Sequence, residues 1–266
     1  MQKYTAIILS SREANEFDRL YSMYTLETGL IKAIGKGVRK STAKLAGHLE
    51  PATLSEVYVA RARGTGQITS VITLSGFENL KIDFEKLGEV LKIFRFFSKN
   101  FAEGEKDERI FDLLRSFLEL ADRADIADRA DPADILIEAF WWKLFDALGQ
   151  RPEVMKCVNC REKLRGQSSV HKVRTSNQGS TFPLLADAHN SSRSNLKKYF
   201  SVEKGGIVCG GCGSNFAELA PISDNQIKLL RIFWGNPLAK IAKVKVNCGE
   251  LEGLGRIREN FEKYSF

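Results

Sequence analysis

Two CxxC pairs are the residues in this sequence whose type and spacing most directly suggest chemistry. They are Cys157–Cys160 and Cys209–Cys212, each with two residues between its cysteines. Zn²⁺ binds four thiolates in a tetrahedron at about 2.3 Å, and one CxxC turn can present two of them to the same ion. We therefore predict one structural Zn²⁺ bound by Cys157, Cys160, Cys209 and Cys212. Four protein ligands leave the ion no open position for catalysis.

Residues 161–208 separate the two pairs, which is more than the roughly 15–20 residues of a compact zinc ribbon. An insertion must therefore extend from the site. The alternatives are two unrelated CxxC turns or a redox dithiol, although a redox CxxC normally begins a helix after a strand. His171 and His189 could replace a cysteine as ligand, but we interpret them as exposed loop residues. Cys248 stands apart, and we predict that it is a half-buried core thiol.

The chain lacks the residue patterns of the common hydrolases and nucleotidases. It contains three histidines and no HExxH or GxSxG motif, and no GxxxxGK followed by Ser or Thr. Gly35-Lys36-Gly37 resembles a phosphate loop only superficially, because its spacing differs from that of a Walker A motif. The sequence therefore predicts a protein that is not an enzyme.

A basic stretch between Gly29 and Leu49 could bind a polyanion. It contains five Lys or Arg residues and no Asp or Glu, and Ser41 and Thr42 add hydroxyl groups. Such a stretch suits contact with the phosphate backbone of nucleic acid, which does not depend on base sequence. The alternative is a solvated loop. The five basic residues are Lys32, Lys36, Arg39, Lys40 and Lys44.

Short β-strands must position this stretch, because residues 4–74 are rich in Ile, Val, Tyr and Thr. Glycines at 64 and 66 provide a tight connection between the last two strands. Five short strands in about 75 residues fit the five-stranded OB barrel. OB barrels stack bases on aromatic rings, for which Tyr21, Tyr24 and Tyr58 are candidates unless they belong to the core. The expected strands are Tyr4–Leu9, Arg19–Leu26, Leu30–Gly35, Leu54–Arg61 and Gln67–Leu74.

Helical periodicity begins after residue 80. Apolar residues recur every three or four positions over residues 87–101 and 110–121. Asp131 and Pro132 can begin a further helix that Gly149 ends, and its apolar body predicts burial on most sides. Ser223-Asp224-Asn225-Gln226 is a capping-box pattern before a helix over residues 227–234, and a last helix is expected over residues 250–264.

We therefore predict a multidomain α+β protein. Its parts are an OB-fold barrel over residues 1–80, a mostly α-helical domain over 81–150 and 221–266, and a zinc-binding segment inserted over 151–220. Residues 81–150 hold 11 basic and 16 acidic side chains, whereas residues 151–220 hold 11 and 5. The whole chain has a net charge of +7, which favours a polyanionic partner. Because no apolar run approaches the ~18 residues of a membrane span, we expect a cytoplasmic protein.

These motifs, in this order, resemble the bacterial recombination-mediator family RecO. The matching positions in the first half are a Gly- and Lys/Arg-rich stretch at Gly35–Ser41, then Leu49-Glu50-Pro51, then a hairpin at Arg61–Gly66. One departure is Arg161, which stands where the family commonly has glycine after the second cysteine. The resemblance covers most of the chain, and the matches in the second half are Leu148-Gly149, Pro152, Gly205-Gly206 and the four cysteines.

The resemblance implies a nucleoid-associated, non-enzymatic DNA-repair protein. Members of the family bind single- and double-stranded DNA, anneal complementary strands and act with RecR. They help to load the recombinase RecA onto DNA coated by single-strand-binding protein (SSB). The alternative is an OB-plus-zinc protein that binds RNA in translation or ribosome assembly. The nucleic-acid-binding residues that we predict are Lys32, Lys36, Arg39, Lys40, Lys44, Tyr58, Arg61 and Arg63.

The family also implies a site for the acidic, apolar C-terminal tail of SSB. Such a site needs an apolar groove with a positive rim. Residues 81–134 are too acidic for this rim, and DNA should occupy the basic stretch of the barrel. We therefore predict that Lys228 and Arg231, on the helix expected over residues 227–234, contact the tail.

Overall fold

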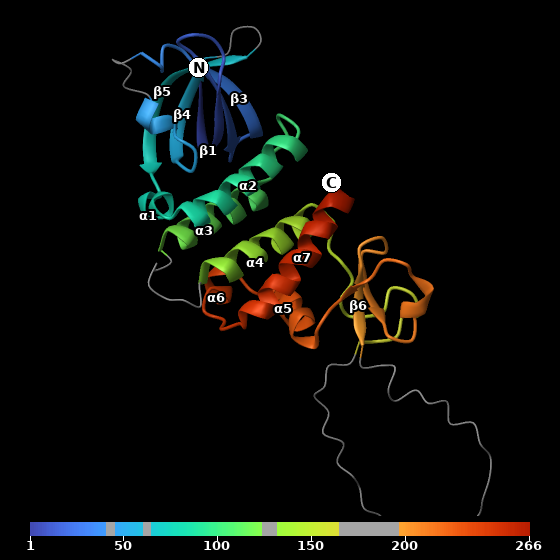
Figure 1. Cartoon of the computed structure of the whole chain (residues 1–266). Helices are drawn as coiled ribbons and strands as arrows, with labels where there is room; N and C mark the ends of the chain where they lie inside the picture. Colours follow the sequence, from blue (N-terminus) through green and yellow to red (C-terminus); the bar gives the residue numbers. More distant parts are fainter. Residues whose placement is uncertain (41–45, 61–64, 124–131, 165–196) are drawn as a thin grey trace, which may run out of the picture. The chain divides into compact units, whose positions relative to one another are not determined.

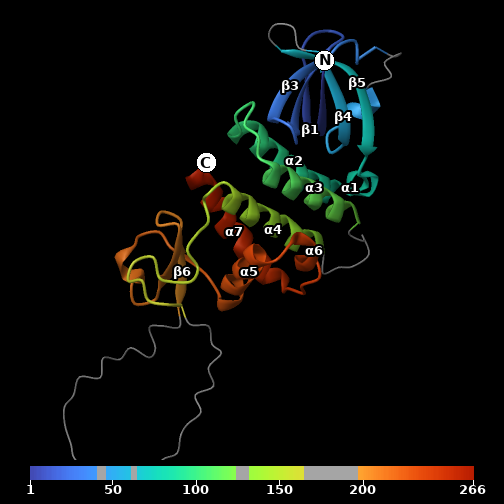
Figure 2. The ribbon, with the colours of Figure 1, turned by 180° about the vertical axis from the view of Figure 1, so that it is seen from behind.

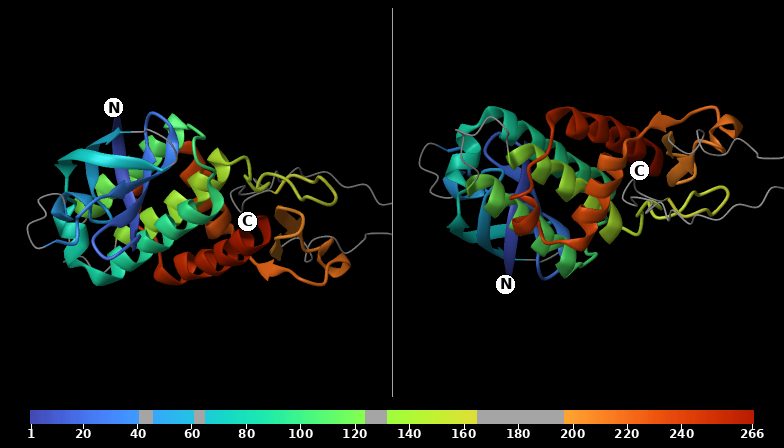
Figure 3. Two further views of the ribbon diagram at one scale, coloured as in Figure 1. Left: turned by 90° about the horizontal axis from the view of Figure 1, so that it is seen from above. Right: turned by 90° about the horizontal axis from the view of Figure 1, so that it is seen from below.

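The computed structural model describes residues 1–40, 46–60, 65–123, 132–164 and 197–266 (Figure 1). This part of the chain divides into two compact units, Met1–Ala147 with Asn236–Lys245, and Leu148–Gly235 with Val246–Phe266. Figures 2 and 3 show the same elements from behind, from above and from below. The domain boundaries expected from the sequence stay a prediction. Among the described helices, none is both long and apolar enough to cross a membrane.

The first unit begins with a closed five-stranded barrel. The strands are hydrogen-bonded in the order β1-β2-β3-β5-β4, and β4 pairs with β1 to close the barrel. β3 and β5 are parallel, whereas the other neighbours are antiparallel. The predicted OB-like barrel is therefore confirmed. Its strands are β1 (Gln2–Glu13), β2 (Arg19–Thr25), β3 (Gly29–Gly35), β4 (Leu54–Ala60) and β5 (Gly66–Ser75).

Alternation along the strands fills the barrel with apolar side chains. In β4, for example, Val57 and Val59 are buried and Tyr58 between them is half-exposed. The short helix η1 (Ala46–Leu49) adds Leu49 to the same core. The core residues are Tyr4, Ala6, Ile8, Tyr21, Met23, Ile31, Ala33, Val38, Leu49, Val57, Val59, Ile68 and Val71.

Helices complete the first unit below the barrel (Figure 1). Asp83 begins α2, because its carboxylate accepts the backbone N–H groups of Glu85 and Lys86. α4 begins at Pro132 as predicted, whereas Asp131 lies outside the described residues. The short α6 packs against α3 and α4. The helices are α1 (Glu78–Ile82), α2 (Phe84–Asn100), α3 (Glu108–Arg123), α4 (Pro132–Ala147) and α6 (Leu238–Ile241).

Aromatic rings join the barrel to these helices. The ring of Tyr24 in β2 meets Phe97 and Phe101 edge to face, with centroids 5.1 and 5.5 Å apart. Phe97 and Phe101 stack on each other at 4.5 Å. Such pairs contribute about 0.5–1.5 kcal/mol beyond the area they bury. Because Tyr24 and Tyr21 are at most 1% exposed, both are core residues and neither can stack on a base.

The second unit combines a small sheet with two longer helices. The strand order is β7-β6-β8, and Phe200 of β6 packs edge to face on Phe261 of α7 at 5.8 Å. The 3₁₀ helix η3 (Gly213–Asn215) follows the second CxxC pair. The other elements are β6 (Lys198–Ser201), β7 (Gly206–Cys209), β8 (Ala220–Pro221), α5 (Asp224–Gly235) and α7 (Cys248–Ser265).

The predicted capping box is present at the start of α5. Gln226 N–H donates to Ser223 Oγ at 3.0 Å, and Ser223 N–H donates to Gln226 Oε1 at 2.9 Å. The Ser223 hydroxyl also donates to the carboxylate of Glu250 at 2.6 Å, which ties α5 to the first turn of α7. Cys248 is the first residue of α7 and is exposed, so its prediction as a half-buried core thiol is wrong. The buried face of α7 begins only at Leu254.

Candidate metal centre and nucleic-acid interface

The four cysteines of the two CxxC pairs converge in the second unit. Their Sγ atoms all lie within 4.8 Å of one another, and those of Cys160 and Cys209 are 3.7 Å apart. Four sulfurs placed tetrahedrally around one Zn²⁺ are about 3.8 Å apart. The cluster therefore has the donor set and the size to hold one metal ion, and it consists of Cys157, Cys160, Cys209 and Cys212.

Backbone hydrogen bonds position the first CxxC turn against the strand that delivers the second pair. The N–H of Arg161 donates to the carbonyl of Cys157 at 2.9 Å, which closes the turn. The N–H of Val158 donates to the carbonyl of Ile207 in β7 at 2.8 Å. Because β7 ends at Cys209, this bond fixes the two pairs relative to each other.

The thiols of the cluster differ in how readily they ionise. Burial raises the pKa of the Cys209 thiol to about 12. Burial also opposes ionisation of Cys157, but backbone N–H groups, first that of Cys209 at 3.4 Å, donate to its Sγ and lower its pKa to about 7. Without a cation, the surroundings of Cys209 therefore disfavour its thiolate at neutral pH. A cation among the sulfurs is what would keep all four deprotonated.

One end of the barrel gathers basic residues that we predicted to bind phosphate. Arg19 pairs with both Glu13 and Gly35, and Gly35 pairs with Ile68. The β1–β2 turn, the end of β3 and the start of β5 therefore lie together, on the far side of the barrel from α2 (Figure 1). We call residues 13–19, 35–40 and 65–68 the turn end. Its exposed side chains include Lys36, Arg39 and Lys40.

Two turns hold each other in place at the turn end. The N–H of Gly37 donates to the carboxylate of Asp18 at 2.7 Å, and the N–H of Arg39 donates to the carbonyl of Phe17 at 3.1 Å. The bond from Gly37 is the main reason that the pKa of Asp18 is lowered, and nearby lysines add to it. Asp18 therefore stays ionised at neutral pH, and this contact between the turns persists.

Two other predicted nucleic-acid residues, Lys32 and Tyr58, lie outside the turn end, and Arg39 within it is already paired with a carboxylate. Lys32 is in the middle of β3, where its ammonium group pairs with the carboxylate of Glu103 at 2.7 Å. Tyr58 is half-exposed on the outer face of β4. Arg39 pairs with Glu13 at 3.0 Å, so a phosphate at Arg39 would have to replace that carboxylate. Three further residues fall outside the described part of the chain: Lys44, Arg61 and Arg63.

Lys228 and Arg231 of α5 have different surroundings. Lys228 is exposed, whereas Arg231 is half-buried. The Nη2 of Arg231 donates to the carbonyl of Val154 at 2.6 Å, and this bond holds the segment before the first CxxC pair. No local pattern predicts this bond, because Val154 is 77 positions away along the chain.

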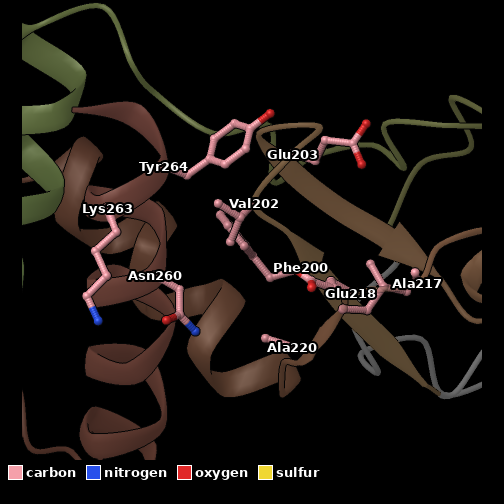
Figure 4. Close-up of a pocket in the computed structure, with 10 residues that line it drawn as sticks. Phe200, Val202, Glu203, Ala217, Glu218, Ala220, Asn260, Lys263 and Tyr264 are labelled. Atoms are coloured by element: carbon pink, nitrogen blue, oxygen red, sulfur yellow. The ribbon is translucent and has the colours of Figure 1, made fainter.

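A cavity of about 830 Å³ lies in the second unit between the small sheet and α7 (Figure 4). Phe200 contributes apolar surface, while Glu203, Glu218 and Lys263 place charges around it. Two carboxylates against one ammonium group make this cavity a poor site for phosphate. The charges of the turn end therefore suit phosphate better than those of this cavity.

Comparison with known proteins identifies the family. A family model described as "Recombination protein O N terminal" matches residues 1–77, and one described as "Recombination protein O C terminal" matches residues 81–186 and 179–264. The chain belongs to the RecO family of DNA repair proteins. A relative named "DNA repair protein RecO" from Dehalococcoides mccartyi is 30% identical over 245 residues, covering 92% of this chain and 83% of that protein.

More distant proteins bear the same name. The relative from Pelotomaculum thermopropionicum is 27% identical over 247 residues, covering 93% of this chain and 82% of that protein. The relative from Roseiflexus sp. is also 27% identical, over 242 residues, covering 91% of this chain and 73% of that protein. The RecO-family match therefore extends over both units.

Backbone geometry explains the glycine pair of the RecO-like cysteine motif and the one departure from it. A Cβ on Gly206 would lie 2.6 Å from the carbonyl oxygen of Glu153, so no larger residue fits there without a shift of the backbone. Gly205 has φ +61°, and Arg161 has φ +64°. This left-handed conformation costs a non-glycine residue on the order of 1 kcal/mol. Glycine, which the RecO resemblance led us to expect at position 161, avoids that cost.

Replacing Arg161 with glycine should therefore stabilise the second unit by about 0.5–1 kcal/mol. The strain disappears, although the greater freedom of glycine in the unfolded chain offsets part of the gain. Thermal unfolding of the wild type, Arg161→Gly and Arg161→Ala measures the effect. Arg161→Ala is the control, because it removes the same charge and keeps the strained Cβ. A glycine variant that melts no higher than the alanine variant would contradict this explanation.

Proposed function

We propose that this chain is a non-enzymatic recombination mediator that binds and anneals single-stranded DNA and helps to load RecA onto SSB-coated DNA. Its membership of the RecO family over 92% of the chain carries the proposal. The exposed Lys36, Arg39 and Lys40 at the turn end support direct contact with phosphates. Duplex DNA is the second proposed ligand, and RecR and the SSB tail are the proposed protein partners.

The chemistry of the turn end suits strand annealing. Two complementary strands repel each other through their phosphates, and lysine and arginine side chains lower that repulsion when they replace bound counterions. Contacts to phosphates do not depend on the base sequence. Any two complementary strands can therefore be held while their bases pair. No bond in the DNA is made or broken in this step.

We propose that the metal of the cysteine cluster is Zn²⁺ and that its role is structural. Four cysteine ligands complete a tetrahedron and leave no position for water or substrate. The apolar cluster around the cysteines is small, with Val208 its one fully buried aliphatic residue among those described. Metal ligation would therefore contribute much of the local folding free energy.

Strand annealing by the purified chain tests the proposed function. A labelled strand and its complement, each naked or coated by SSB, should pair faster when the chain is present. Binding to single-stranded DNA, duplex DNA and structured RNA is compared at one salt concentration. No acceleration of annealing would contradict the mediator function. A preference for structured RNA would favour the RNA-binding alternative, which the family match does not favour.

Replacing Lys36, Arg39 and Lys40 together with alanine should reduce the salt dependence of DNA binding. Loss of three phosphate contacts lowers the slope of log K against log salt by about 2 for single strands and about 2.7 for duplex DNA. Binding should weaken alike for all base sequences. Salt titrations followed by fluorescence anisotropy measure both quantities.

The matched control for this variant replaces Lys92, Arg95 and Lys99, which are three exposed basic residues of α2, with alanine. It removes the same charge from a different surface of the first unit. Equal slopes for the two triple variants would show that position does not matter and that the contact surface lies elsewhere.

Metal analysis should find one Zn²⁺ per chain. Cys157→Ser should lose the metal and melt at a lower temperature, because the buried thiolate is a ligand and metal binding is coupled to folding. Cys248→Ser is the control, since Cys248 is exposed and outside the cluster. Less than half an equivalent of zinc in the wild type, or full zinc in Cys157→Ser, would refute the assignment.

Charge reversal on α5 should weaken binding of an SSB tail peptide and leave binding of naked DNA nearly unchanged. The double variant Lys228→Glu with Arg231→Glu also breaks the bond from Arg231 to the Val154 carbonyl, so Lys228→Glu alone is the cleaner test. Lys263→Glu on α7 makes the same change at another exposed lysine of this unit. Anisotropy of a labelled peptide measures the dissociation constant. If Lys228→Glu binds the peptide like the wild type, the tail does not contact this residue.

A further inference from the structure

Phe17 presents an aromatic ring at the turn end. It lies in the connection between β1 and β2 and is 45% exposed. Burying such a ring in the core would have been favourable, and the barrel has Tyr21 in its core two residues into β2. The ring is instead left partly exposed to solvent at the turn end.

Several contacts fix the position of Phe17. Its N–H donates to the side-chain oxygen of Asn15 at 3.1 Å, and its carbonyl accepts the N–H of Arg39 at 3.1 Å. The ammonium group of Lys40 lies 5.3 Å from the centre of the ring, within the range of a cation–π contact. The bond between Asp18 and Gly37 holds the same two turns together. The exposed ring is thus ordered before any ligand arrives, which lowers the cost of binding.

The charges around Phe17 narrow the chemistry of its ligand. Besides Lys40, the turn end exposes the basic side chains of Arg19 and Lys36 and the acidic side chains of Glu13 and Glu16. Glu13 is engaged by Arg39 and Asp18 by Gly37, which leaves a surface with more available positive than negative charge. A flat ring beside cations matches a ligand with a flat aromatic part and an anionic part a few ångströms away. A nucleotide of a single strand has both, whereas duplex DNA covers each base face with the next base.

We propose that Phe17 stacks on an unpaired base of single-stranded DNA while Lys36 and Lys40 contact the adjoining phosphates. This inference rests on the proposed binding of DNA by the turn end, and it adds the residue that would distinguish single strands from duplex. The base would then stack on Phe17 instead of on the neighbouring bases of its strand. Its Watson–Crick edge would stay exposed for pairing, which suits a protein that anneals strands.

Variants at position 17 of the whole 266-residue chain test the proposal with a labelled oligothymidine and a labelled duplex. Phe17→Ala should weaken single-strand binding by about tenfold, the value of one lost base–aromatic stack, and change duplex binding less than twofold. The slope of log K against log salt should stay the same, because no charge is removed. Phe17→Trp should bind as well as the wild type or better.

Two controls separate stacking from other effects. Phe17→Leu keeps an apolar side chain without a ring, so it should fail to restore binding. Phe84→Ala removes a Phe that is 84% exposed at the start of α2, and it should bind like the wild type. Equal losses for single strands and duplex, or wild-type binding by Phe17→Leu, would overturn the stacking proposal alone. A wild-type chain that binds neither form of DNA would overturn the proposed function as well.

Discussion

Parallel pairing between β3 and β5 is the constraint on which the closed barrel depends. It consists of only three residue pairs, Ala33 with Gly66, Ile34 with Gln67 and Gly35 with Ile68. These pairs close the barrel and bring the end of β3 to the start of β5, which are about thirty residues apart in the sequence. The β1–β2 turn joins them through the pairing of β2 with β3. Without closure, β3 and β5 would be sheet edges, and the start of β5 would not lie beside the two turns that carry Phe17, Asp18 and the basic side chains.

The second unit is stabilised differently from the barrel, because its sheet is too small to fold by burying apolar side chains alone. Its strands have four, four and two residues. Four sulfurs converge beside this sheet, α5 and α7 add buried apolar side chains such as Phe233 and Phe261, and hydrogen bonds that cross long stretches of sequence join the parts. Arg231 reaches the Val154 carbonyl, and Ser223 reaches Glu250. The unit thus combines one cysteine cluster with apolar helix faces and a few directed polar contacts, whereas the barrel relies on a continuous apolar interior.

The sequence was most informative where residues close together in the chain determine the local structure by themselves. Enrichment in Ile, Val, Tyr and Thr located all five barrel strands, CxxC spacing found the four sulfurs, and Ser223 with Gln226 marked a helix start. It failed where packing at a distance decides the outcome. Nothing local distinguishes the buried Tyr21 and Tyr24 from the half-exposed Tyr58, and Cys248 is exposed because of how α7 faces α5. Phe17 escaped notice because its importance comes from Lys40 and Arg39, which the pairing of β2 with β3 brings beside it.

The way the two units share the chain affects how the protein can be made. Each unit contains two stretches of sequence, and the second stretch of the first unit, Asn236–Lys245, follows most of the second unit. Leu238 and Ile241 of α6 are buried, and α6 packs on α3 and α4. A ribosome releases the barrel early, since all of its strands precede residue 76. The apolar surface of α3 and α4 that receives α6, however, stays uncovered until the ribosome has passed residue 241. While almost a hundred residues are added after α4, the nascent chain therefore exposes an apolar helical surface. A chaperone could bind this surface during that interval.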